Sequence, residues 1–151
     1  MERVLHLAAE YLSTKIYSIP ESNPYQMAIT TYALHRAPHR TKAEAYERFK
    51  LMARKSEFLY WSDVEIPKNP TQIVNTRILM GVRDKHETQG QALRATCYGL
   101  MLYLEYDEFE EAKPIVSWIR TQPNALVGWD SSQDTLLVFQ VKLGRFQYSN
   151  I

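Results

Sequence analysis

The stretch 125–139, ALVGWDSSQDTLLVF, places a loop, a helix cap and an apolar helix directly after one another. Ser131 is a residue type that caps helix N-termini, and Asp134, three residues later, can accept a hydrogen bond from the backbone amide of the cap. Residues 135–139 supply four apolar side chains in five positions, a pattern too apolar for a surface helix. A buried helix is therefore predicted to begin at Ser131.

Trp129 is the largest side chain of the loop that leads into this predicted helix, between Gly128 and the cap at Ser131. We expect its indole to pack against a neighbouring helical hairpin and to fix the angle at which the chain enters the helix. Trp129, Ser131 and Asp134 are therefore assigned structural roles and not catalytic ones.

Five further segments have the apolar spacing of helices. With the predicted C-terminal helix, amphipathic and buried segments alternate along the chain. This alternation predicts an all-α fold in which three helical hairpins form two concentric layers, with the buried helices inside. The amphipathic segments are 2–17, 41–54 and 108–122, and the segments that are apolar on nearly every face are 23–34 and 91–104.

Local signals place the ends of several of these helices. Asn23 can cap the second helix with Pro24 at its first position, where no amide donor is needed. Thr41 and Glu44 have the spacing of a capping box for the third helix. Three further expectations are an apolar face of the first helix made by Leu5, Ala8, Leu12 and Ile16, a cap at Asp107 completed by Glu110, and a kink or helix start at Pro114.

The segment 57–88 is expected to be an irregular connection within a single domain that covers residues 1–151. Two runs inside it, 58–61 and 73–82, are rich in aromatic or aliphatic side chains and are bounded by turn formers. Each run fits a short strand or a packed loop.

Composition excludes several classes of protein. The 151 residues are 45% hydrophobic and 23% charged, values typical of a soluble globular domain. A net charge of +1 gives no electrostatic footprint for nucleic acid or an anionic membrane, and we expect neither partner. No apolar run reaches the roughly 18 residues of a membrane-spanning helix, and residues 1–10 lack the apolar region of a signal peptide.

Three blocks of the sequence resemble the thioester domains of the alpha-macroglobulin and complement superfamily. Residues 128–135, GWDSSQDT, resemble the signature near the end of those domains, and residues 95–101, ATCYGLM, are similar to a family helix that reads Ala-Thr-Ser-Tyr-Ala-Leu-Leu. The blocks follow the family's order. The third block consists of Tyr25, Ala28, Tyr32, Ala33 and Leu34.

The resemblance implies a closed (α/α)6 toroid of six helical hairpins, of which this chain would form the C-terminal half. Members of the family trap proteases or act as complement-like opsonins, and their thioester acylates amines or hydroxyls on a target. That thioester joins a cysteine to a glutamine in a Gly-Cys-Gly-Glu-Gln loop, and no such run occurs here. No histidine here matches the motif of the one that assists acyl transfer.

Cys97 falls where the resemblance expects a small core residue, and we predict that it packs and does not react. The chain is therefore predicted to be no enzyme, to have no catalytic residues and to need no cofactor. Through a full-length parent, the implied partners are proteases or cell-surface targets and the parent's neighbouring domains. The implied location of that parent is extracellular, either secreted or attached to a surface.

Two other classes of function stay open at this point. An enzyme on a related helical ring, such as a glycosidase, needs paired acids, and 105–111 contains five, but acids at the start of a helix more simply form a solvated face. A non-catalytic α-solenoid interaction module predicts a regular repeat, which is not found. His35 and His39 have a spacing of four residues, but Pro38 disfavours one helix face for both, so no metal site is predicted.

Overall fold

The computed structural model describes residues 2–66 and 85–122 of the chain. Within these residues it contains five helices and one pair of short strands, which confirms the predicted all-α class. The further prediction of half a toroid stays a prediction. The elements are α1 (Glu2–Lys15), α2 (Pro24–Arg36), α3 (Lys42–Leu51), β1 (Arg54–Lys55), β2 (Leu59–Tyr60), α5 (Lys85–Glu105) and α6 (Phe109–Thr121).

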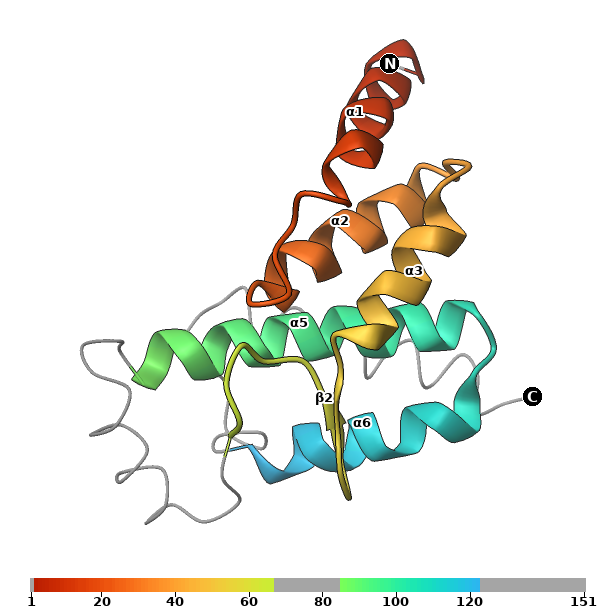
Figure 1. The fold of residues 1–151 in the computed structure, drawn as a ribbon. Coiled ribbons are helices and arrows are strands. Elements are labelled where there is room, and N and C mark those ends of the chain that lie inside the picture. The colour runs from red at the N-terminus through yellow and green to blue at the C-terminus, as the bar shows by residue number, and fades with distance from the viewer. Residues whose placement is uncertain (1, 67–84, 123–151) are drawn as a thin grey trace.

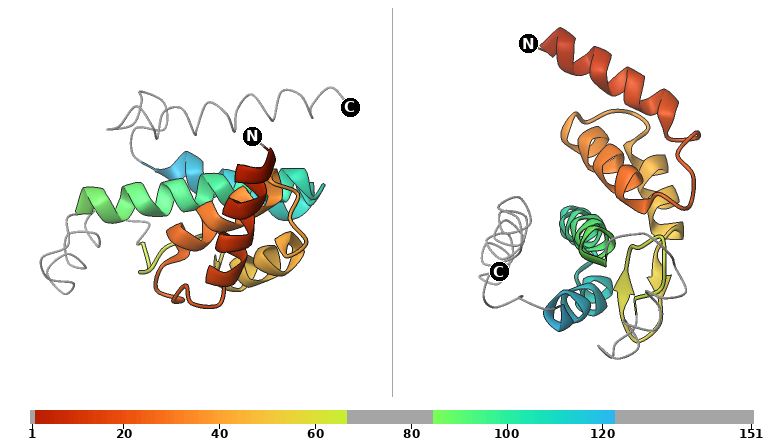
Figure 2. Two further views of the ribbon diagram at one scale, coloured as in Figure 1. Left: turned by 90° about the horizontal axis from the view of Figure 1, so that it is seen from above. Right: turned by 90° about the vertical axis from the view of Figure 1, so that its left-hand side faces the viewer.

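The longest helix, α5, lies in the middle of these elements (Figure 1). It packs against α2 on one side and against α6 on another, while α3 packs on α2 and β2 contacts both α5 and α6. Figure 2 shows α1 at the end of the molecule farthest from α6, beyond α2. The part of α5 from residue 90 to residue 104 has no exposed side chain, as predicted for 91–104.

Trp61, which directly follows β2, joins the strand pair to helices α3 and α5. Its side chain is completely buried, its indole Nε1 donates to the Phe49 carbonyl at 2.8 Å, and its ring stacks on Phe49 with centroids 4.4 Å apart. Its backbone amide donates to Thr96 Oγ1 at 3.1 Å. The same ring lies against Gly99, where an added Cβ would be only 2.4 Å from Trp61 Cζ3. Trp61 therefore fixes the distance between α3, the strand pair and α5.

The strand pair itself is a small antiparallel hairpin in which Arg54 pairs with Tyr60 and Lys55 with Leu59. This confirms the strand interpretation of the run 58–61. The Arg54 guanidinium connects β1 to the segment that follows β2, because Nε donates to the Ser62 carbonyl and Nη2 to the Asp63 carbonyl, both at 2.9 Å.

The predicted irregular connection 57–88 is too long at its C-terminal end, and part of it lies outside the described residues. Helix α5 already begins at Lys85, three residues before the end of that segment. The run 73–82 lies outside the described residues.

The N-cap of α2 is as predicted, whereas that of α3 is not. Asn23 Oδ1 accepts the Gln26 amide at 3.1 Å, and Pro24 opens the helix. The predicted capping box at Thr41 is wrong, because the Thr41 side chain makes no cap hydrogen bond. Its hydroxyl lies 2.9 Å from His39 Nδ1 instead, and Glu44 accepts the Tyr17 hydroxyl at 2.5 Å. A local contact with His39 and a tertiary contact with Tyr17 thus take the place of the capping box.

The turn between α5 and α6 also differs from the prediction. Asp107 does not cap α6, because it has a positive φ of 58° and follows the C-terminus of α5. The Glu108 amide donates to the Tyr103 carbonyl and the Asp107 amide to the Leu104 carbonyl, the two bonds of a Schellman motif. Pro114 lies inside α6, so it does not set the helix start.

Helix α1 buries only part of the predicted face, because Leu12 packs against the core and Ile16, just beyond the helix, is completely buried. Leu5 and Ala8 are exposed, whereas Ala9 and Ser13 are buried. All side chains from residue 2 to residue 8 are exposed, so only the second half of the helix contacts α2. The apolar spacing gave the correct element and the second half of its buried face, but not the exposure of Leu5 and Ala8, because the spacing carries no information about where the neighbouring helix ends.

Candidate functional site

Cys97 lies on the central helix among completely buried neighbours. Ala95, Thr96 and Cys97 are all 0% exposed, and Tyr98, which follows them, is half-buried with its ring 5.2 Å from that of Tyr32. A thiol reacts as the thiolate and must be reached by its target. The Cys97 sulfur is therefore shielded from solvent-borne electrophiles and nucleophiles. Its predicted lack of reactivity stays a prediction.

A polar cluster ties α3 to the turn between α5 and α6. The Tyr46 hydroxyl donates to Glu108 Oε2 at 2.9 Å, and Lys50 Nζ lies 3.4 Å from Glu108 Oε1. The Tyr46 ring stacks on Tyr106 with centroids 4.1 Å apart and meets Tyr103 edge-on at 5.7 Å. We call these five residues the tyrosine cluster.

The electrostatics of the tyrosine cluster favour neutral phenols. Burial, and then the hydrogen bond to Glu108, raise the pKa of Tyr46 far above its ordinary value. Burial, and then the negative charge of Glu108, raise the pKa of Tyr103 to about 12. Burial lowers the pKa of Lys50, but Glu47 and Glu108 more than offset this and leave it raised. Tyr46, Tyr103 and Lys50 therefore stay protonated near neutral pH and cannot act as general bases there.

The acidic residues of 105–111 do not form a catalytic pair. Glu105 accepts from His35 at 3.4 Å, Glu108 belongs to the tyrosine cluster, and Glu110 pairs with Lys113 one turn along α6. Glu110 and Glu111 are exposed on the first turn of α6. These contacts agree with the solvated-face interpretation, in which acids stabilise a helix N-terminus.

The histidines that were considered as metal ligands lie in separate environments. His35 pairs with Glu105, whereas His39 is buried and lies 3.2 Å from Glu10 Oε1 through Nε2. His39 Nδ1 accepts the Thr41 amide at 3.3 Å, so Nε2 of the neutral ring bears the hydrogen and donates to Glu10. In residues 2–66 and 85–122, no three His, Cys, Asp or Glu side chains come together in a way that could hold a metal ion.

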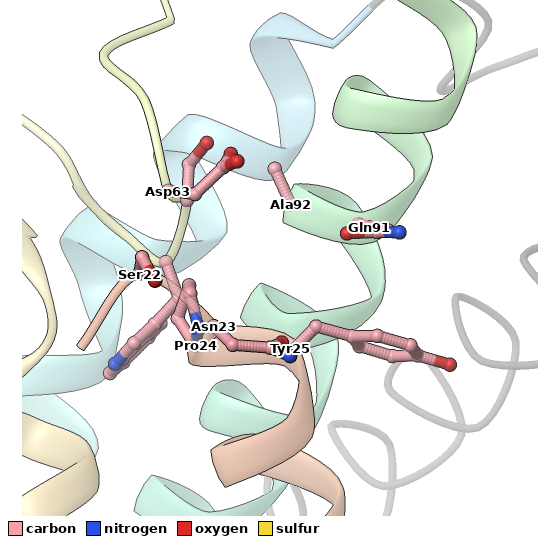
Figure 3. A pocket seen from close by; sticks show the side chains of 9 residues that line it. Ser22, Asn23, Pro24, Tyr25, Asp63, Gln91 and Ala92 are labelled. Atoms are coloured by element: carbon pink, nitrogen blue, oxygen red, sulfur yellow. The ribbon is translucent and has the colours of Figure 1, made fainter. Parts of the chain in front are cut away.

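A shallow hollow lies where the N-terminus of α2 meets α5 and the segment after β2. It encloses about 210 Å³, open solvent included, and the space a water molecule can enter is about that of one water. Figure 3 shows the side chains of Asn23, Tyr25, Asp63 and Gln91 around it. Small-molecule sites are typically several hundred Å³ and largely enclosed. This hollow is too small for a substrate or cofactor.

The predicted structural residues divide into two groups. Cys97 lies in the described core, whereas Trp129, Ser131 and Asp134 lie outside the described residues. The sequence interpretation missed Trp61 and the tyrosine cluster. A signal for Trp61 was available, because Gly99 interrupts an apolar helix and glycine marks close approach of another group. No local pattern marks the pairing of Tyr46 with Glu108, which are 62 positions apart.

No helix in the described part of the chain is both long and apolar enough to cross a membrane.

Comparison with known proteins identifies a family. A family model described as the A-macroglobulin TED domain matches residues 1–141. Complement C3 of Lethenteron camtschaticum is 28% identical over 141 residues, which are 90% of this chain and 7% of that protein. Complement C3 of Oncorhynchus mykiss is 44% identical over 48 residues, which are 32% of this chain and 3% of that protein. The chain thus spans only a small part of the length of these curated relatives.

Proposed function

This chain belongs to the A-macroglobulin TED domain family, and from that premise we propose that it is the C-terminal portion of the thioester domain of a complement-like protein. In that role it supplies the packed helical body of the domain and a surface for the parent's neighbouring domains. It forms no thioester of its own and is not an enzyme. Two relatives named complement C3 favour the complement branch of the family over a general protease trap.

The observation that supports this proposal best is the environment of Cys97. The family's thioester needs a cysteine within a Gly-Cys-Gly-Glu-Gln loop, and the one cysteine of this sequence lies in the run ATCYGLM instead. That cysteine is 0% exposed on α5, within the block that resembles a family helix. The acylating group of such a parent therefore belongs to a different segment from this one.

For a parent of the complement branch, the proposed function is opsonisation of cell-surface targets. For a parent of the macroglobulin branch, it would be endopeptidase inhibition. Both functions place the parent outside the cell, secreted or attached to a surface. The targets react with the parent's thioester, and this chain contributes non-covalent packing. An α-solenoid interaction module without a thioester parent is the competing function, and the second experiment below separates the two.

The first experiment tests whether the chain is chemically inert. Native protein is incubated with labelled methylamine, an amine that opens thioesters, and with iodoacetamide, and both products are measured by mass spectrometry. We expect no methylamine adduct, and alkylation of Cys97 that is slow in native buffer and fast in denaturant. A methylamine adduct that disappears in Cys97→Ser would show that the chain itself has a reactive acyl group.

The second experiment tests the parent. The transcript that encodes this chain is read upstream of Met1 in the same frame. We expect it to encode a Gly-Cys-Gly-Glu-Gln loop within the first half of a thioester domain. A reading frame that begins at Met1 would favour the interaction module.

A further inference from the structure

The tip of the β1–β2 hairpin exposes a lysine at the end of a pair of basic residues. Lys55, Ser56 and Glu57 are all exposed, and Ala53 and Arg54 before them are half-buried. The two strands are connected by only two residue pairs and by the Ser56 amide, which donates to the Phe58 carbonyl at 2.9 Å. Exposed loop tips of this kind are preferred sites of proteolytic nicking.

Two other exposed basic residues, Arg40 and Lys113, are less suitable for a protease. Arg40 is exposed, but His39 before it is buried, and the Thr41 amide after it donates to the His39 ring. Lys113 lies inside α6, where its carbonyl precedes Pro114. A protease must bind several consecutive residues in an extended form, so a basic residue held in a helix or beside a buried residue is reached only after unfolding.

Arg54 and Lys55 differ in how far their side chains can move. Nε and Nη2 of Arg54 donate to the carbonyls of Ser62 and Asp63, so its guanidinium is already occupied. Lys55 is exposed on the same short strand. A protease with a pocket for a basic side chain can therefore take Lys55 without first breaking the Arg54 contacts.

The residues after the tip are held independently of it. Tyr60 stacks on Trp118 with ring centroids 4.9 Å apart, and Trp61 is bonded to Phe49 and Thr96. Opening the tip therefore leaves the strand end and the core in place. The energy needed is that of a local opening and not of global unfolding.

We propose that the Lys55–Ser56 bond is a cleavage site for a protease of trypsin-like, lysine-accepting specificity, and that the nicked chain stays one folded body. In the reaction, the amide C–N bond between Lys55 and Ser56 breaks, water supplies the second oxygen of the new Lys55 carboxylate, and both protons of the water go to the new Ser56 amine, which becomes an ammonium. The Arg54 contacts then bridge the two fragments, together with the buried Trp61.

The test is limited digestion of the native protein with a lysine-specific endoprotease. We expect the new N-terminus at Ser56 to form at least about ten-fold faster than cleavage after Lys50 on α3, because the tip opens locally and the helix does not. The nicked fragments should elute together in native buffer and separate in denaturant. Equal rates at the two bonds, or separation of the fragments in native buffer, would overturn the proposal.

The matched control is a substitution that changes which protease can cut this bond. In Lys55→Arg, the lysine-specific enzyme should lose this bond and an arginine-specific enzyme should gain it, with an unchanged melting temperature. In the original protein, the arginine-specific enzyme should leave the Arg54–Lys55 bond intact until the protein is denatured. Cleavage at Arg54–Lys55 in the native protein would contradict the proposed role of the Arg54 contacts.

Discussion

Helices α5 and α1 are both partly apolar in sequence, yet they are buried to very different extents. From residue 90 to residue 104, α5 has no exposed side chain, because α2, α6 and the strand pair all pack on it. Helix α1 has exposed side chains throughout residues 2–8, and Val4 and Leu7 are 69% and 60% exposed. The difference teaches that burial depends on how many elements surround a helix and only secondarily on its apolar content.

The two helices are also held by different kinds of contact. Helix α5 is fixed by close packing against Trp61, which leaves no room for a side chain at Gly99. Helix α1 has a narrow buried stripe, and polar contacts add to it, since Glu10 accepts from His39 and, just beyond the helix, Tyr17 donates to Glu44. Substitutions around α5 should therefore cost several kcal/mol, whereas those on α1 should cost little.

The largest effect is expected for Trp61→Ala. It removes a completely buried indole and its hydrogen bond to the Phe49 carbonyl, which keeps the Met52 amide as a donor. We expect a loss of about 3–5 kcal/mol in the free energy of unfolding, measured by urea denaturation. The control is Leu51→Ala, because Leu51 is 86% exposed and should change stability by no more than about 0.5 kcal/mol. Similar losses for both variants would mean that Trp61 does not organise the core.

The next effect is expected for Gly99→Ala. At an exposed helix position this change stabilises by about 1 kcal/mol. Here the new Cβ would lie 2.4 Å from Trp61 Cζ3, and the ring cannot retreat because it is stacked on Phe49. We expect a loss of about 1–3 kcal/mol.

The clash at Gly99 can be separated from other effects by a double-mutant cycle with Trp61→Phe. The smaller ring makes room for the Cβ, so Gly99→Ala should become neutral or stabilising in that background. Additive losses in the two variants would show that the indole is not the group that excludes alanine. The family helix that residues 95–101 resemble has alanine where this chain has Gly99.

A smaller effect is expected for Glu108→Gln in the tyrosine cluster. It removes the carboxylate charge that accepts from the Tyr46 hydroxyl and pairs with the Lys50 ammonium, at a cost of about 1–2 kcal/mol. It also removes the negative charge that, after burial, raises the pKa of Tyr103. Spectrophotometric titration should then show Tyr103 ionising below the value of about 12 in the original protein. An unchanged Tyr103 titration would show that the charge of Glu108 does not contribute to the raised pKa of Tyr103.

The sequence predicted the elements well and their tertiary partners poorly. Periodicity placed the helices, and Asn23 with Pro24 correctly marked the start of α2, because caps are set by neighbouring residues. The capping box at Thr41 failed because buried His39 and distant Tyr17 bind its two members.

The same limit applies to the candidate site. The burial of Cys97 followed from an apolar helix, which is a local property. The contacts of Trp61 with Thr96 and of Tyr46 with Glu108 join residues 35 and 62 positions apart. Such contacts depend on how helices pack, and no short pattern contains that information.

The smallest effect is expected for Glu10→Gln, which tests the polar contact of α1. The hydrogen bond from His39, with a smaller contribution from the positive charge of Arg40, lowers the pKa of Glu10 below its ordinary value. A carboxyl whose pKa is lower in the folded state stabilises the fold above its unfolded pKa, and this contribution is lost as pH falls through the folded pKa. The melting temperature of Glu10→Gln should therefore lie slightly below that of the original protein at pH 7, and the difference should disappear as pH falls through the lowered pKa of the folded-state carboxyl. Glu21→Gln, in the exposed turn before α2, is the matched control and should show no such convergence. A difference that persists unchanged in acid would mean that α1 is held by its buried stripe alone, with Glu10 and His39 adding nothing to it.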